Sequence, residues 1–280
     1  MNSLSDVVLI AGGQRVLSVA PSPAFWIAVV AYTAASAALL FVLGGHERAR
    51  RWALGLVVLA FVAHGADIGL RGVAHVHPAQ SVREALGFMA FIITGGYLVA
   101  SARYRLTLGG AVVLPVALVL LVVARLSPAG EQTDMIALGR IHISLATVGV
   151  GIFALAAALS AIYLVEERAL KKKRFDTLAF KDKGAPLDAL DRWSNRLIWV
   201  GFPIFTVALV LGAIWVSKLG EDLTRIEYPL AAVTWFAYAT LIIARAAYGW
   251  RGRRAARLTL IGFAAALAVL AIYLVRRMVA

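Results

Sequence analysis

The stretch Ile141–Val165 reads IHISLATVGVGIFALAAALSAIYLV and contains no Asp, Glu, Lys or Arg. A helix needs about 20 predominantly apolar residues to cross the hydrocarbon core of a bilayer, and this run meets that length. No water is available in the bilayer core, so a spanning segment must satisfy its own backbone hydrogen bonds, as a helix does. The stretch therefore predicts a transmembrane helix rather than a strand, although it contains β-branched residues.

The same pattern recurs along the chain and predicts an all-α, polytopic helical membrane bundle. The composition agrees, because 61% of the residues are hydrophobic and 15% are charged, whereas soluble domains average about 45–50% and about 25%. An ordinary soluble enzyme and a disordered chain are excluded. We expect a single membrane domain over residues 1–280, with eight spans at about 24–43, 53–70, 85–102, 106–124, 141–165, 197–216, 228–244 and 258–275.

The basic residues predict the orientation of these spans. The formal net charge is +13, and the 28 lysines and arginines lie between the apolar runs, which is typical of a membrane protein rather than of a nucleic-acid-binding protein. Because cytoplasmic loops are enriched in Lys and Arg, we expect both termini outside, with the Arg276–Arg277 pair as an exception. No cleavable signal peptide is expected. Most basic residues fall in the connections 44–52, 103–105, 166–196 and 245–257.

The long connection 166–196 predicts a basic cytoplasmic loop with a short surface helix. Its polybasic start, Lys171–Arg174, suits anionic lipid headgroups. Leu187, Leu190 and Trp193 then recur at a spacing of three, which indicates an amphipathic helix on the inner surface before the sixth span. This helix could rest on lipid or dock a cytosolic partner.

Polar residues at membrane depth mark the first candidate site. His64, Asp67 and Arg71 lie at offsets of three and seven in the second span, which places them on one helical face. A charge at the bilayer centre costs at least ~2.5–3.5 kcal/mol, so we expect this face to point into the bundle. Asp67 could accept the proton of one His64 nitrogen and leave the other for a metal ion. The alternative is a hydrogen bond that only joins two helices.

The remaining histidines gather toward the outer side. His142 lies one turn inside the outer end of the fifth span, and His75 and His77 occupy an outer loop, whereas His46 falls in an inner loop. A loop histidine is more often solvated than a ligand, while both roles stay open for His142. Neutral imidazoles converging on one side of a helical bundle suit haem iron. Arg71 and Arg140 could then pair with the haem propionates, since the guanidinium matches carboxylate geometry.

Other chemistries are disfavoured by the motifs. The chain has no cysteine, which excludes disulfides, thiolate metal sites and a cysteine nucleophile. No P-loop, HExxH, GxSxG or GxGxxG pattern occurs in a usable context. We therefore expect a protein that is not an enzyme. Two glycine pairs, Gly95–Gly96 and Gly109–Gly110, predict close helix contacts instead of phosphate loops.

Several stretches together resemble the cytochrome c assembly family of membrane proteins, in its CcsA and HemX (YpjD-like) branches. The order and spacing of these stretches carry the resemblance, which covers about the last two thirds of the chain. They are PAQSVREAL at 78–86, IHISLATVGVGIFALAAALSAIYL at 141–164, LDALDRWSNRLIWVGFPIFTVALVLGAIW at 187–215, and the segment 235–263 with its basic GWRGRR hairpin.

This resemblance implies an eight-span fold and haem as the cofactor. By position, His142 matches a haem-ligating histidine of the family at the start of the fifth span. His64 matches a second-span histidine of the HemX-like branch. The segment 216–229 holds no tryptophan and no histidine, where haem-handling members carry a Trp-rich external segment. That difference favours the HemX-like branch.

The sequence thus predicts a haem-interacting, multi-pass protein of the bacterial inner membrane. We expect it to assist cytochrome c maturation or to regulate haem biosynthesis, in contact with proteins of either process and with no nucleic acid. In the expected mechanism His142 and one of His64 or His77 approach the haem, and Asp67 tunes His64. Two alternatives stay open: a non-catalytic scaffold that recruits a cytosolic partner, and a small-molecule transporter with His64 and Asp67 as a proton relay.

Overall fold

A computed structural model describes residues 7–11, 14–18, 21–74, 76–104, 106–126, 137–172, 186–219 and 225–279. Within these ranges the chain forms eight long helices and one short β-hairpin. The helices are α1 (Pro23–Leu43), α2 (Ala49–Val73), α3 (Val82–Arg103), α4 (Thr107–Leu126), α5 (Ala137–Lys171), α7 (Leu187–Leu219), α8 (Glu227–Tyr248) and α9 (Arg253–Val279).

All eight predicted spans are confirmed as helices, and each of the eight is long and apolar enough to cross a membrane. The helices α5 and α7 are much longer than the spans they contain, because polar residues continue the helix at its inner end. Sequence hydropathy detects only the apolar part of a helix, so it underestimates both. The protein is a multi-pass helical membrane bundle.

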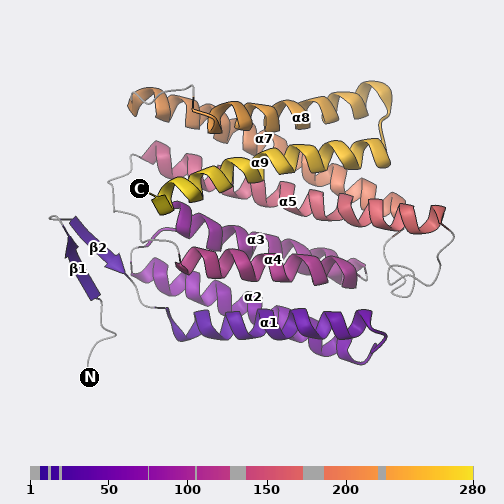
Figure 1. Ribbon diagram of the computed structural model, residues 1–280, viewed down its shortest axis with the longest axis horizontal. Coiled ribbons are helices and arrows are strands. Elements are labelled where there is room, and N and C mark those ends of the chain that lie inside the picture. The colour runs from indigo at the N-terminus through magenta and orange to yellow at the C-terminus, as the bar shows by residue number, and fades with distance from the viewer. Residues whose placement is uncertain are drawn as a thin grey trace.

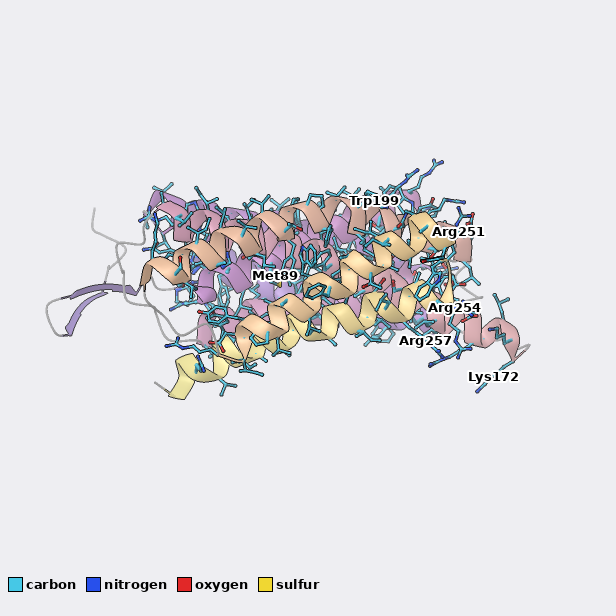
Figure 2. All side chains as sticks on the ribbon, turned by 90° about the horizontal axis from the view of Figure 1, so that it is seen from above. Met89, Lys172, Trp199, Arg251, Arg254 and Arg257 are labelled. Atoms are coloured by element: carbon cyan, nitrogen blue, oxygen red, sulfur yellow. The ribbon has the colours of Figure 1, made fainter. Side chains whose placement is uncertain are left out.

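Successive helices run in opposite directions, so the bundle has two distinct ends (Figure 1). We call the end with the start of α1 and the end of α9 the outer end, following the predicted orientation. The other end carries basic side chains: Lys172, Arg251, Arg254 and Arg257 lie together there (Figure 2). The first helix therefore starts and the last helix ends at the same end of the bundle (Figure 1), as expected for eight spans.

The bundle packs as two groups of helices that share α5. One buried cluster comes mainly from α1 to α4, and the other from α5, α7, α8 and α9. Small residues let the helices approach closely. A β-carbon at Gly149 of α5 would lie 3.3 Å from the Phe205 backbone of α7, and one at Gly151 would lie 3.1 Å from Ile92 of α3. This close packing makes α5 the link between the groups.

The predicted glycine contacts lie in the first group. A β-carbon at Gly95 would lie 3.0 Å from the Phe61 ring of α2, and one at Gly96 would clash with Leu155 of α5. A β-carbon at Gly110 would likewise clash with the Tyr97 hydroxyl of α3 and with Leu39 of α1. These glycines serve helix packing, as the sequence indicates.

A β-hairpin precedes α1 and adds to the predicted all-α fold. Its strands, β1 (Val7–Ala11) and β2 (Gln14–Ser18), pair antiparallel with Val7 opposite Ser18. In the sequence, two runs with β-branched residues flank a Gly-Gly pair, a strong signal for a two-residue hairpin loop. The predicted all-α fold does not include this hairpin. The hairpin lies beyond the outer end of the bundle (Figure 1).

The predicted separate surface helix is wrong in one respect. Residues 187–196 are helical, but they form the first turns of α7 and continue into the sixth span without interruption. Leu190 is 2% exposed and packs in the α1–α4 cluster, so its apolar side meets the bundle instead of lipid. The polybasic segment runs beyond Lys172 outside the described residues.

The orientation can be tested with single cysteines, because the chain contains none. Arg140→Cys places a thiol at the exposed outer start of α5, and Lys172→Cys places one at the exposed inner end. We expect a membrane-impermeant maleimide to label Arg140→Cys in intact cells and Lys172→Cys only after lysis. Labelling with the opposite pattern would invert the assigned topology.

Candidate functional site

His142 is held by a hydrogen bond to the backbone of a neighbouring helix. It lies in the second turn of α5, half-buried, and its Nδ1 is 2.7 Å from the Ala208 carbonyl oxygen of α7. A carbonyl oxygen only accepts, so Nδ1 donates the ring proton. The other ring nitrogen, Nε2, is then the unprotonated one in the neutral imidazole. This is the tautomer that binds a metal through Nε2.

One face of α7 is shaped around this ring. Ala208, Gly212 and Trp215 follow one another at spacings of four and three, so they share a helical face. A β-carbon at Gly212 would lie 2.6 Å from Cε1 of His142, and therefore only glycine leaves room for the ring. The Trp215 ring lies 5.9 Å from the imidazole, tilted by 45°. The arrangement presents one oriented imidazole, which suits a single axial ligand.

His64 lies in a different group of helices and has a different partner from the one we predicted. It is 1% exposed, and its Nδ1 is 3.2 Å from the Tyr32 hydroxyl of α1. The same hydroxyl is 2.9 Å from Thr94 Oγ1 of α3, and Thr94 donates to its own helix at Ala90. This chain joins α1, α2 and α3. The predicted His64–Asp67 hydrogen bond is absent from the described contacts.

Asp67 is instead part of a buried ion pair. Its Oδ2 accepts from Arg125 Nη2 at 2.7 Å, with exposed side-chain fractions of 3% and 8%. Its Oδ1 accepts from the Ser22 hydroxyl at 2.7 Å, and Ser22 also caps the start of α1 by accepting from Phe25 N. Asp67 therefore joins α1, α2 and α4. A guanidinium carries a full positive charge, so its hydrogen bond to a carboxylate is stronger than that of a neutral imidazole. This difference explains why the carboxylate faces Arg125 instead of His64.

Arg71 pairs with a carboxylate of the next helix. Its guanidinium makes a bidentate contact with Glu84 in the first turn of α3, and the Nη2–Oε1 distance is 2.8 Å. The predicted inward face of α2 is confirmed, since His64, Asp67 and Arg71 all line one small pocket. The pocket has a volume of about 10 Å³, close to the room needed for one water molecule.

The other predicted site residues lie apart from both places. His77 is exposed in the connection between α2 and α3, where its Nδ1 accepts from Ala79 N at 3.0 Å. Arg140 is exposed at the outer start of α5. His75 lies outside the described residues. Among the residues that the structure describes, no group of three or more His, Asp or Glu is placed to bind a metal ion.

Sequence reasoning missed Arg125, Glu84, Tyr32 and Ser22. A signal was available for two of them, because Arg125 ends the fourth span and Glu84 opens the third at the outer side, at the depth of Arg71. Oppositely charged residues at one depth in antiparallel spans pair readily. The hydroxyl partners gave no such signal, since serine and tyrosine are common in spans without a partner.

Arg276, one of the two outward basic residues near the end of the chain, has a partner that the sequence did not predict. Arg276 Nη1 lies 2.5 Å from Glu227 Oε1, and the Glu227 side chain is 2% exposed. Glu227 begins α8 and Arg276 lies in the last turns of α9, so this pair joins the two helices at the outer end. The pair gives the buried Glu227 carboxylate a positive partner, but Arg276 stays an exception to the orientation rule, which counts Lys and Arg rather than net charge.

Comparison with known proteins places the chain in a family. Residues 80–279 match the family described as "Cytochrome C assembly protein". The chain belongs to the cytochrome c assembly family. The matched region includes His142, Glu84 and Arg125, whereas His64, Asp67 and Arg71 precede it.

Relatives with the name "Cytochrome c biogenesis protein CcsA" agree with this assignment. The chain is 25% identical to the one from Trieres chinensis over 68% of this chain and 72% of that protein. It is 27% identical to the one from Gloeothece citriformis over 74% and 79%. A shorter match to the one from Gloeobacter violaceus is 37% identical over 27% and 23%. No solved structure gives a significant match.

The hydroxyl of Tyr32 is expected to contribute measurably to the stability of this family member. Tyr32→Phe leaves buried His64 and Thr94 without a shared partner, which costs about 1–3 kcal/mol for an unsatisfied buried group. We expect the free energy of unfolding to fall by that amount in SDS-induced unfolding from mixed micelles. Tyr248→Phe is the matched control, since Tyr248 is 77% exposed, and an equal loss in both variants would contradict the role of the buried hydroxyl.

Proposed function

We propose that this protein handles haem in cytochrome c maturation and that His142 is an axial ligand of the haem iron. The observation that carries the proposal is the hydrogen bond between His142 Nδ1 and the Ala208 carbonyl. It fixes the tautomer whose Nε2 lone pair is available to a metal ion. The family match and the relatives named for cytochrome c biogenesis support the same process.

The residues around His142 fit one axial ligand of haem. The bound haem would supply an iron ion that can be ligated by an imidazole nitrogen. The role of the chain is to hold the imidazole: Ala208 orients it, Gly212 leaves space for it, and Trp215 gives it an aromatic neighbour. Because the ring is fixed before haem arrives, little side-chain entropy is lost on binding.

The second axial ligand and the propionate partners remain proposals from the sequence. His64 and His77 are the two candidates for the second ligand, and Arg71 and Arg140 for the propionates. Arg140 lies two residues before His142 and is exposed, whereas Arg71 is engaged by Glu84. This difference favours Arg140. Tuning of His64 by Asp67 would be electrostatic only, as the two side chains have other hydrogen-bond partners.

The membrane, the cargo and the partner proteins are also part of the proposal. We place the protein in the bacterial inner membrane, with haem as cargo and with cytochrome c maturation or haem-biosynthesis proteins as partners. It acts by binding and orientation, without catalysing a reaction. The HemX-like branch is favoured by the absence of Trp and His from residues 216–229.

Two alternatives find less support. A scaffold that docks a cytosolic protein on residues 187–193 needs an accessible helix, but Leu190 is buried and Asp191 binds Arg245 at 2.8 Å. A transporter with a His64–Asp67 proton relay needs these groups to exchange a proton, but each contacts another side chain. Haem handling through His142 requires neither.

Haem titration of the purified protein tests the proposal. We expect the wild-type protein to shift the Soret band of haem, and His142→Ala to weaken haem binding by at least about tenfold, because a direct iron ligand is lost. His46→Ala is the matched control, since it removes an exposed inner-end histidine. Unchanged haem binding in His142→Ala would refute the ligand assignment.

The spectra of two further variants separate the candidates for the second ligand. If His64 or His77 would ligate the iron together with His142, the wild-type spectrum has bis-histidine character. The corresponding alanine variant then loses that character while haem stays bound. The other variant keeps the wild-type spectrum. If neither variant changes the spectrum, His142 acts without either histidine.

A further inference from the structure

The pocket at the outer end of α2, α3 and α4 lies in a charged cluster whose charges do not balance. Arg71, Arg83 and Arg125 carry three positive charges, and Asp67 and Glu84 carry two negative ones. Their exposed side-chain fractions range from 3% to 14%. One positive charge is therefore in excess among the described residues here, in a setting where an uncompensated charge is costly.

Three buried guanidinium nitrogens of the cluster have no hydrogen-bond acceptor within the described residues: Arg71 Nε, Arg83 Nε and Arg125 Nη1. Of these three side chains, Arg125 is the least exposed. Arg125 uses Nη2 for Asp67, while its buried Nη1 has no hydrogen-bond acceptor within the described part of the chain. The side chain is 8% exposed and lines the pocket. The Phe25 ring packs against the guanidinium at 5.0 Å. A buried donor of this kind calls for an acceptor.

The pocket supplies the space for that acceptor. Its volume of about 10 Å³ accommodates one group of the size of a water molecule. Apart from the ionic side chains and His64, its walls are apolar, with Ile68, Phe88 and Leu121 among them. A water molecule would satisfy the hydrogen bond of Nη1, but it would leave the positive charge unbalanced. A small monovalent anion satisfies both.

We propose that this pocket is an anion site that binds one small, singly charged group, with Arg125 as its principal donor. The group is either a free halide ion or the carboxylate end of a ligand that enters from the outer end. The site does not depend on the proposed role of His142, because its lining comes from α2, α3, α4 and the α2–α3 connection, whereas His142 contacts α7.

Chloride binding to the full-length protein in detergent tests the proposal through the line width of ³⁵Cl in NMR. A bulky sulfonate salt keeps the ionic strength constant, since its anion has no carboxylate and is too large for the pocket. We expect saturable broadening in the wild type, and a loss of affinity of about tenfold or more in Arg125→Gln, because a hydrogen bond to a charged group is lost. Arg140→Gln is the matched control, as it removes an exposed arginine from the same end.

A second variant moves the affinity in the opposite direction. Asp67→Asn raises the excess charge and leaves the shape of the side chain unchanged, so chloride should bind about tenfold more tightly than in the wild type. If the Asp67–Arg125 ion pair had only a structural role, Arg125→Gln and Asp67→Asn would both lower the stability of the protein and would not change chloride affinity in opposite directions. If Arg125→Gln does not elute as a folded, monodisperse species, Arg125→Lys replaces it, because lysine keeps the positive charge that pairs with Asp67. Arg125→Lys should also weaken chloride binding.

Competition identifies the source of the anion. If sodium acetate displaces chloride at equal concentration, the pocket accepts the carboxylate of a ligand, and if acetate leaves chloride bound, it is a halide site. Equal broadening in the wild type, Asp67→Asn and the Arg125 variants would overturn the proposal. None of these outcomes depends on haem, so a failure here is distinct from a failure of the His142 assignment.

Discussion

The buried contact between Asp67 and Arg125 shows the constraint on which the whole structure depends. An ion inside an apolar bundle is tolerated only when it has a charged partner and its remaining lone pairs are satisfied. Asp67 meets this condition with one guanidinium and one hydroxyl, and these come from two other helices. The depth and rotation of α1, α2 and α4 are thereby fixed relative to one another. Apolar packing alone fixes the depth and rotation of a helix less sharply, since apolar helix faces can shift against each other at little cost in free energy.

The same rule operates in the other group of helices. Asp191 of α7 accepts from Arg245 of α8 and from the backbone N–H of Gly252, where φ is +66° and favours glycine. One carboxylate therefore joins α7, α8 and the turn before α9 at the inner end. Glu227 and Arg276 join α8 and α9 at the outer end. Polar pairs thus hold both ends of this group, while aromatic side chains fill its middle: Phe153 stacks on Tyr238 at 3.8 Å.

The helices could be predicted from the sequence because their signal is local. Each run, such as 141–165, is apolar along its own length, and length and hydropathy suffice to recognise a span. The partners of polar residues are not local. The sequence correctly predicts that His64 and Asp67 lie on an inward face. That His64 contacts Tyr32 while Asp67 contacts both Ser22 and Arg125 depends on the relative rotation of the helices. Because Asp67 lies one turn from His64 on the same helix, the sequence predicts a hydrogen bond between them. In the structure, Asp67 accepts a hydrogen bond from Arg125 of α4 instead.

His142 illustrates the opposite case, in which the residue can be singled out from the sequence but its contacts cannot. The sequence places an imidazole near the outer end of a span, and it also contains Gly212 and Trp215 in another span. Nothing local connects them, yet Gly212 is the residue whose missing side chain admits the ring. The carbonyl of Ala208 then decides which nitrogen carries the proton. His64 is also held by a hydrogen bond, but its partner is the Tyr32 hydroxyl, which can donate or accept and so does not decide which nitrogen carries the proton. His142 has a fixed orientation because α5 and α7 approach closely at Gly149 and along their shared length, so the geometry that suits a metal ligand is a consequence of helix packing.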